Sequence, residues 1–207
     1  MFERPNAQQV HISLEGIEPA IWRRLIVPAD WTLDQLHLGI QAAFGWANYH
    51  LHEFLIGGLR YGDAATLSDG AFDDDARVFD SSEVRLRDFQ GGGVQFLYLY
   101  GFGDSWRHLV RLERPTLLQA VPKFASCIAG ARARPPEDVG GTSGYERFLE
   151  ILADPDDQEF ADTKRWCGGH FDPEWFDLDH INKDLRNALR SNARRPLIQP
   201  KPKQPKS

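Results

Sequence analysis

The stretch Tyr98-Leu99-Tyr100-Gly101-Phe102-Gly103-Asp104-Ser105-Trp106-Arg107-His108 carries the clearest fold signal in this chain. Two runs rich in aromatic and aliphatic residues, 94–100 and 106–112, flank a turn with two glycines and an aspartate. Such runs on either side of a short glycine-containing turn are typical of a β-hairpin. We therefore expect two adjacent strands, with Asp104 and His108 close together at the rim of a sheet.

The N-terminal part predicts a second hairpin followed by a helix. Residues 9–16 alternate between apolar and polar, and residues 20–27 form another strand-like run. Thr32 is a good N-cap, and Gln35 occupies the third helical position that a capping box requires. Gly45 would end this helix in a left-handed conformation.

The order of these elements predicts an α+β fold. A strand over 50–56 and a short segment over 84–89 complete a mixed, mostly antiparallel sheet with one crossing helix, consistent with a β-grasp-like topology. Residues 124–144 resemble a loop, because they are rich in Gly and Pro. Further helices are expected at 144–153 with Ser143 as N-cap, at 159–166, and from the Asp172-Pro173 pair through Leu178 to Leu189. Alone they bury too little apolar surface, so we expect them to pack on the sheet.

The chain is expected to form one domain over residues 1–193, with an acidic loop near 63–82. Residues 194–207 are basic and rich in proline, which predicts a disordered tail. The tail contributes +5 to the formal net charge of −6, which leaves −11 on residues 1–193. Because DNA binding normally needs clustered cations, nucleic acid is an unfavourable partner except weakly through the tail.

Several features of the composition indicate the cellular compartment in which the protein is expected. No apolar run approaches the roughly 18 residues of a membrane span, and residues 1–9 lack the apolar core of a signal peptide. The two cysteines, Cys127 and Cys167, are too few for a disulfide scaffold and are expected to be free, buried thiols. The sequence therefore predicts a cytoplasmic protein that does not contact membranes.

Several blocks in this order resemble the plasmid pRiA4b ORF-3-like family, whose members often carry the label IS element passenger TnpR family protein. The blocks are Ile21-Trp22-Arg23-Arg24, Gly45-Trp46 with His50-Leu51-His52, Tyr98 to His108, Cys127-Ile128-Ala129-Gly130, Pro135-Pro136-Glu137-Asp138 with Gly140-Gly141 and Gly144-Tyr145, and Phe171-Asp172-Pro173. The resemblance covers roughly residues 10–189. It implies a single-domain α+β fold and an association with plasmids and mobile elements, but no particular activity.

Three positions depart from the family pattern. Gly101 stands where Asp is usual, and Arg134 and Val139 stand where cysteines often flank the Pro-Pro-Glu-Asp block. A metal held by those cysteines together with Cys127 in relatives would lack its ligands here. The resemblance therefore implies that these cysteines are not essential.

The label TnpR suggests a DNA resolvase or recombinase, but the residues do not support this hypothesis. Ser13, the early serine, lies beside Glu15, and a carboxylate is unfavourable where phosphoryl transfer needs cations. His108 and Arg111 match the spacing of a tyrosine recombinase, with Tyr145 following. On a strand, however, side chains three residues apart point to opposite faces.

A metal-dependent hydrolase is a stronger enzymatic alternative. The candidate ligands are His50, His52, Asp104 and His108, with Glu137, Asp138 and the cluster Asp172, Glu174, Asp177, Asp179 and His180. His50 and His52 would share one strand face, although no His-Glu-x-x-His or paired-cysteine motif is present. Cys167 with His170 offers a nucleophile and base without a supporting motif. Turns and helix caps explain the aspartates equally well.

The hypothesis we favour is a non-enzymatic accessory protein that binds an unknown protein, peptide or ligand and needs no cofactor. An aromatic rim of Tyr98, Tyr100, Trp106 and His108, joined by Trp46 and Tyr49, would suit recognition of a partner. Alternatively, these rings fill the core. Arg23 and Arg24 are expected to bridge Glu137 and Asp138, which would make the Pro-Pro-Glu-Asp loop a structural clamp.

Overall fold

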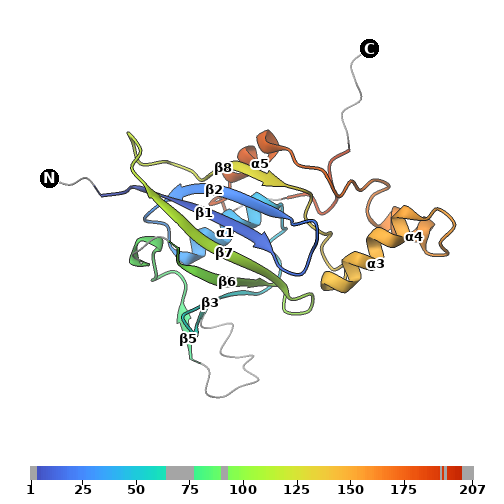
Figure 1. Ribbon diagram of the computed structural model, residues 1–207, viewed down its shortest axis with the longest axis horizontal. Coiled ribbons are helices and arrows are strands. Elements are labelled where there is room, and N and C mark those ends of the chain that lie inside the picture. The colour runs from blue at the N-terminus through green and yellow to red at the C-terminus, as the bar shows by residue number, and fades with distance from the viewer. Residues whose placement is uncertain (1–3, 64–76, 90–92, 192, 194, 202–207) are drawn as a thin grey trace, which may run out of the picture.

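The computed structural model describes residues 4–63, 77–89, 93–191, 193 and 195–201. Its centre is a twisted sheet in the order β5-β4-β3-β6-β7-β1-β2-β8 (Figure 1). The strands are β1 (Ala7–Leu14), β2 (Trp22–Pro28), β3 (His52–Ile56), β4 (Leu59–Gly62), β5 (Val78–Asp80), β6 (Gln95–Tyr100), β7 (Trp106–Thr116) and β8 (Ser126–Ala131). Every neighbouring pair is antiparallel except β4 and β5.

The fold is therefore the mostly antiparallel α+β class that the sequence predicts. Both predicted hairpins are present: β1 pairs with β2, and β6 pairs with β7 so that Tyr98 lies opposite His108. The more specific β-grasp expectation is wrong. Strand β1 lies between β2 and β7 and is antiparallel to both, so the sheet has no parallel pair at its centre.

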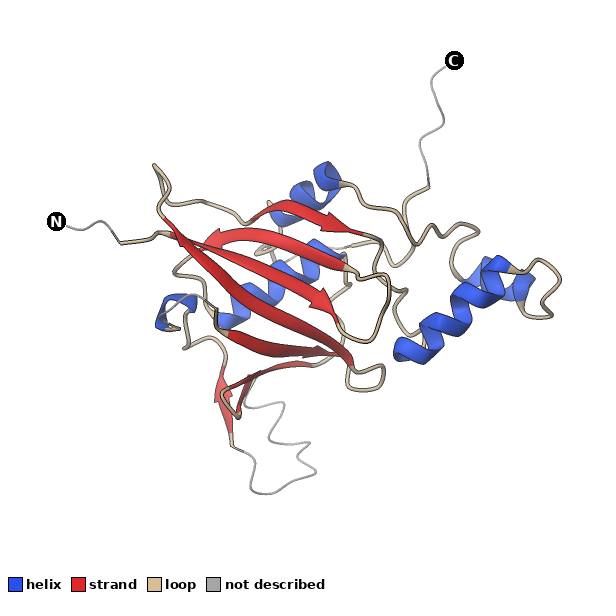
Figure 2. Cartoon of the chain, viewed as in Figure 1, coloured by secondary structure: helices blue, strands red, loops and turns tan. Residues whose placement is uncertain are grey.

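Helix α1 (Leu33–Phe44) crosses one face of the sheet (Figure 2). Its start is the predicted capping box, in which Thr32 Oγ1 accepts from the Gln35 amide and Gln35 Oε1 accepts from the Thr32 amide. Its end is Gly45, at φ 84°. The main core lies between this helix and the sheet, because both contribute completely buried side chains such as Ile40 and Val10.

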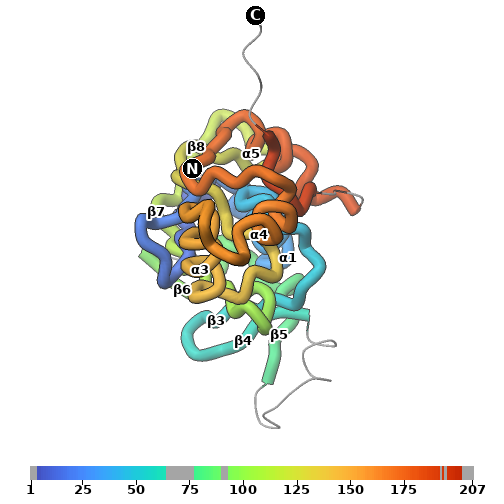
Figure 3. Tube along the Cα trace, turned by 90° about the vertical axis from the view of Figure 1, so that its right-hand side faces the viewer, coloured from blue at the N-terminus to red at the C-terminus, as the bar shows by residue number. Residues whose placement is uncertain are grey.

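Among the described residues, three further helices follow in the C-terminal part. Helices α3 (Gly141–Ala153) and α4 (Phe160–Trp166) lie across one end of the sheet (Figure 3), whereas α5 (Leu178–Leu185) contacts α1 and β8. Helix α3 begins before the predicted Ser143 cap, because Gly140 and Gly141 allow the positive φ angles of this entry. Helix α5 is capped by Asp177, which accepts from the His180 amide, and not by Asp172.

Other expectations are corrected or fall outside the described residues. Strands β4, β5 and β8 were not predicted, and β8 occupies part of the expected 124–144 loop. The segment 84–89 holds a 3₁₀ helix, η1 (Leu86–Asp88). Most of the predicted acidic loop, 64–76, lies outside the described residues. Within the described part of the chain, no helix has the length and apolar character that a bilayer span requires.

Candidate functional site

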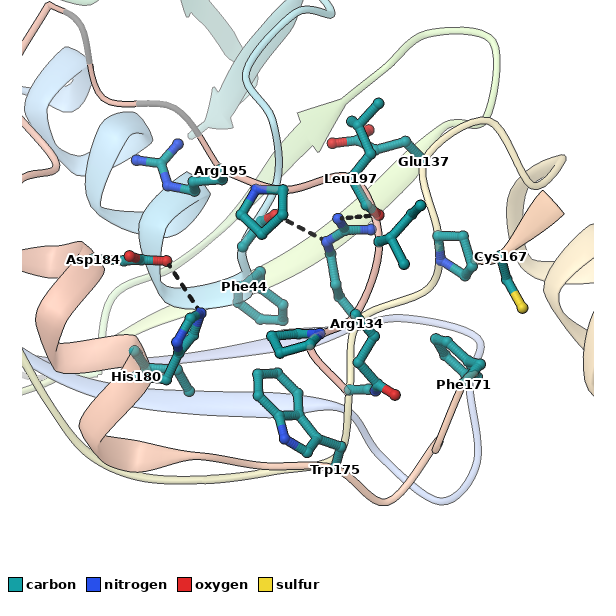
Figure 4. Close-up of a pocket in the computed structure, with 18 of the residues that line it drawn as sticks. Phe44, Arg134, Glu137, Cys167, Phe171, Trp175, His180, Asp184, Arg195 and Leu197 are labelled. Atoms are coloured by element: carbon teal, nitrogen blue, oxygen red, sulfur yellow. Dashed lines mark hydrogen bonds and ion pairs between the residues drawn. The ribbon is translucent and has the colours of Figure 1, made fainter. Parts of the chain in front are cut away.

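A cavity of about 270 Å³ lies where α1 ends, between the loop after β8, helix α5 and residues 195–200 (Figure 4). Phe44, Phe171 and Trp175 supply aromatic surface to its walls. Arg134 lies near the middle, with Glu137 to one side. A concave, mostly apolar space with a few polar groups is the usual form of a binding site in proteins.

Arg134 is held by main-chain carbonyl groups. Its Nε donates to the Gly45 carbonyl at 3.0 Å, and its two terminal nitrogens donate to Pro135 at 2.6 Å and Leu197 at 3.2 Å. Its guanidinium carbon lies 5.0 Å from the centroid of a Trp46 ring, within cation–π range. Burial lowers the pKa of Arg134, and the negative charge of Glu137 opposes that shift. This arginine therefore ties the end of α1 to the C-terminal segment.

The Pro-Pro-Glu-Asp loop brings two carboxylates to the mouth of the cavity. Glu137 Oε1 accepts from the Ala47 amide at 2.6 Å, whereas its Oε2 has no hydrogen-bond partner among the described residues. The Glu137 side chain is only 4% exposed, and burial raises its pKa. Asp138 accepts from Tyr49 at 2.8 Å. His50 Nε2 lies 3.0 Å from Asp138 Oδ1 and 3.8 Å from Glu137 Oε2.

Residues 195–200 form one side of the cavity. The sequence predicted that these residues belong to a disordered tail. Arg195 donates to the Trp46 carbonyl at 3.1 Å. Gln199 forms two hydrogen bonds with the main chain of Asp172, at 2.7 and 2.8 Å. Ile198 packs so closely on Gly168 that a β-carbon there would lie 2.4 Å from Ile198 Cγ2. The segment is thus anchored on the body at several separate points.

Three comparisons define the relationships of the chain. Residues 6–180 match the family described as plasmid pRiA4b ORF-3-like protein. The chain belongs to this family. It is 35% identical over 198 residues to the uncharacterized protein y4hQ of Sinorhizobium fredii, covering 90% of this chain and 94% of that protein.

A solved structure shares the fold of this pRiA4b ORF-3-like chain. It is the crystal structure of MM3350, a protein of unknown function from Methanosarcina mazei Go1, at 36% identity and a TM-score of 0.73. The likeness covers 87% of this chain and 97% of that one. The matched residues 6–180 include the Pro-Pro-Glu-Asp loop, whereas segment 195–200 follows them.

The expected aromatic rim of this family member is instead part of its core. Tyr98, Tyr100, Trp106 and His108 are all at most 1% exposed. His108 Nε2 accepts from the indole N–H of Trp46 at 3.2 Å. Its Nδ1 lies 3.0 Å from the Trp106 carbonyl, which fixes the neutral tautomer that carries its proton on Nδ1. Burial lowers the pKa of His108 to about 4. The sequence alternative in which these rings fill the core is therefore correct for these four residues and for Trp46, whereas Tyr49 is 50% exposed.

The two histidines proposed to share a strand face are separated. Strand β3 begins at His52, so the alternation does not extend to His50. His52 stacks on His37 with ring centroids 3.4 Å apart, whereas His50 contacts Asp138 of the Pro-Pro-Glu-Asp loop. In the part of the chain that the structure describes, no three His, Cys, Asp or Glu side chains are grouped as metal ligands. The candidate set of His50, His52, Asp104 and His108 does not converge.

Asp104 lies at the exposed turn between β6 and β7, as predicted. Its Oδ2 accepts from the Gly140 amide in a long contact of 3.4 Å. The turn also lies against the start of α3, because a β-carbon on Gly141 would lie 2.7 Å from the Asp104 carbonyl oxygen. Asp104 therefore approaches the end of the Pro-Pro-Glu-Asp loop but does not face His108.

The predicted bridge from Arg23 and Arg24 to Glu137 and Asp138 is wrong. Arg23 donates to four main-chain carbonyl oxygens, those of Trp22, Ala43, Ala131 and Arg132, at 2.7 to 3.0 Å. Its guanidinium lies between the rings of Phe44 and Phe176, and burial lowers its pKa to about 10. Arg24 instead forms an ion pair with Glu113 at 2.9 Å. Adjacent strand residues point to opposite faces, so the pair could not act together.

The remaining candidate residues, which are the two cysteines, the aspartates near α5 and Ser13, have contacts that explain them as structural residues. Burial raises the pKa of the Cys127 and Cys167 thiols, which opposes thiolate formation. Asp177 is a helix cap, and Asp172 accepts from the Glu174 amide in a turn. Ser13 lies on β1, opposite Trp22 of β2 and Leu109 of β7.

Sequence reasoning missed Arg134 and the C-terminal segment as parts of this site. Arg134 was noted only as a departure from the family pattern. No motif marks it, because its partners are main-chain carbonyl groups that any sequence supplies. The composition of segment 195–200 gave no sign of its ordered position, since proline and basic residues indicate disorder on average.

Proposed function

We propose that the chain is a binding module that holds a proline-containing peptide on the surface that its own residues 195–200 now cover beside the cavity, called the groove below, which includes Trp46, Arg134, Gly168 and Asp172. One observation supports this most: the segment contacts the body at separate points through the Leu197 carbonyl and through the side chains of Arg195 and Gln199. Grooves lined by aromatic side chains are a recurrent means of binding proline-containing segments, because proline reduces the entropy lost on ordering. The proposal fits a plasmid-associated accessory protein.

The segment lies in the groove as an intramolecular competitor. A tethered segment has an effective concentration in the millimolar range, so a free peptide must compete against it. An external peptide is therefore expected to bind weakly unless the anchors of the segment are removed. This sets the design of the test.

The test uses a full-length released variant that carries Arg195→Ala, Ile198→Gly and Gln199→Ala together. A fluorescent peptide with the sequence of residues 194–201 is titrated against it and against the unaltered chain. We expect saturable binding to the released variant, at least about tenfold tighter than to the unaltered chain. Far-ultraviolet circular dichroism and thermal unfolding check that the released variant is folded.

Substitutions at two neighbouring glycines test whether the peptide binds at the proposed position, one as the test and the other as its matched control. Gly168 and Gly169 have φ angles of 84° and 83°, so alanine strains both equally. A β-carbon meets Ile198 only at Gly168. Gly168→Ala in the released variant should weaken peptide binding, and Gly169→Ala should not. Absence of saturable binding to the folded released variant would contradict the proposed function.

A further inference from the structure

The contacts of segment 195–200 differ in how much sequence information they carry. The Leu197 carbonyl accepts from Arg134, a contact that any residue supplies, and the Leu197 side chain is 54% exposed. Gln199, Ile198 and Arg195 instead contact the body through their side chains. These three positions are the ones at which the groove distinguishes one peptide from another.

The carboxamide oxygen and nitrogen of Gln199 both form hydrogen bonds with the main chain of one residue, Asp172. Oε1 accepts from the Asp172 amide at 2.7 Å, and Nε2 donates to the Asp172 carbonyl at 2.8 Å. Only a carboxamide offers a donor and an acceptor side by side on a chain of this length. A glutamate of the same shape would place a charged oxygen against the Asp172 carbonyl. An asparagine would be one methylene too short.

Ile198 is 46% exposed, and part of its side chain packs on Gly168, which has no side chain of its own. Gly168 lies at φ 84°, and a β-carbon on it would lie 2.4 Å from Ile198 Cγ2 and 3.0 Å from Ile198 Cδ1. This contact favours a branched apolar side chain directly before the glutamine. Together, the two positions define an Ile-Gln pair that the groove recognises.

Arg195 marks the other end of the segment. It donates to the Trp46 carbonyl at 3.1 Å. Burial lowers the pKa of Arg195, while the carboxylate of Asp184 favours its charged form. Pro196 and Pro200 also line the cavity and fix two backbone φ angles. A long cationic donor four residues before the glutamine therefore completes the pattern.

From these contacts we propose that the partner of this groove is a polypeptide exposing an Arg-Pro-x-Ile-Gln-Pro segment, where x is any residue. The proposal rests on the proposed function and adds the sequence that the site selects. Residues 195–200 of the chain carry the same pattern and act as the internal competitor of that partner. The pattern is directional, since the arginine lies toward α1 and the glutamine toward Asp172.

A panel of peptides tests the selection on the full-length released variant. The parent peptide covers residues 194–201, and the others carry Gln199→Glu, Gln199→Asn or Leu197→Ala. We expect Gln199→Glu and Gln199→Asn to weaken binding about three- to tenfold, because each loses a solvent-exposed hydrogen bond to the Asp172 main chain. Leu197→Ala is the matched control and should change affinity by less than about threefold.

The possible results separate the two claims. Equal binding of the parent and Gln199→Glu peptides would overturn the proposed pattern and leave the peptide-binding function standing. If the parent peptide does not bind the folded released variant, both claims fail. Discrimination at Gln199 with tolerance at Leu197 supports both.

Discussion

Gln199 and Asp172 are joined by two hydrogen bonds, one in each direction, although 27 residues separate them in the chain. The side chain of one residue thus pairs with the main chain of the other as a neighbouring strand would. Through this pair the C-terminal segment becomes one wall of the cavity at the end of α1. The loop after β8 and the glycine cap of α1 supply the opposite side.

Gly168→Ala should detach the C-terminal segment in the otherwise unaltered chain. The added β-carbon would overlap Ile198, which must then leave its position. Thermolysin cleavage before Ile198, followed by mass spectrometry, is expected to accelerate about tenfold or more, because cleavage follows the population of the open form. Gly169→Ala carries the same backbone strain without the overlap. Equal cleavage of both variants would contradict this account of the contact.

Arg23→Ala should be strongly destabilising, whereas Arg24→Ala should not. Loss of Arg23 removes the donor from four main-chain carbonyl groups, two in buried and two in part-buried hydrogen bonds, and removes a side chain packed against Phe44 and Phe176. We expect a loss of about 3 kcal/mol or more in the free energy of unfolding. The Arg24–Glu113 pair is only partly buried, and such a pair near the surface is worth about 1 kcal/mol or less. Urea denaturation of both variants measures the difference, and similar losses would refute the assignment.

Acid should destabilise the fold through its buried histidines. Burial lowers the pKa of His52 and of His108 to about 4 in the folded state, below the ordinary value of 6.5. The unfolded chain therefore binds protons first, and stability is lost as the pH falls from 6.5 toward 4. The two groups together give a slope that approaches ~2.7 kcal/mol per pH unit.

A single substitution isolates the share of His52 in that slope. His52→Phe keeps a ring against His37 but removes a group that titrates, so its stability relative to the unaltered chain should improve as the pH falls below 6.5. The measurement is urea denaturation of both proteins between pH 4 and 8. A difference that does not change with pH would show that His52 takes up protons equally in the folded and unfolded chain.

Gly141→Ala should disturb the junction between the β6–β7 turn and α3. Gly141 lies at φ 70°, and a β-carbon there would lie 2.7 Å from the main-chain oxygen of Asp104. We expect a cost of about 1–3 kcal/mol from the strained backbone and the overlap. Gly103→Ala in the same turn meets nothing within 4 Å and is the control. Thermal unfolding of the two variants should differ clearly, and equal midpoints would rule out the close approach.

The sequence predicted much of the sheet but not which of its faces is covered. The aromatic and aliphatic runs at 94–100 and 106–112, on either side of a glycine-containing turn, correctly indicated strands β6 and β7. They could not show that Tyr98 and His108 face α1, because large side chains occur on both faces of these runs. Strand β8 was missed because Ser126–Ala131 consists mostly of small residues with weak alternation.

The candidate site was predictable only in part. The Pro-Pro-Glu-Asp block and His50 were both proposed as functional residues, and the structure places His50 against Asp138, which lines the cavity together with Glu137. Their partners were not predictable, since Ala47 and Gly45 contribute only main-chain groups. Segment 195–200 is positioned by several individual contacts, made by Arg195, Leu197, Ile198 and Gln199, and amino-acid composition does not predict such contacts.

Hydrogen exchange of the Asp172 amide, measured by NMR on the full-length chain, tests most directly whether segment 195–200 occupies the groove. The amide donates to Gln199, so it should exchange slowly in the unaltered chain and about tenfold faster or more after Gln199→Ala. Equal exchange rates in the two proteins would show that the segment does not occupy the groove, and the account of the site would fail.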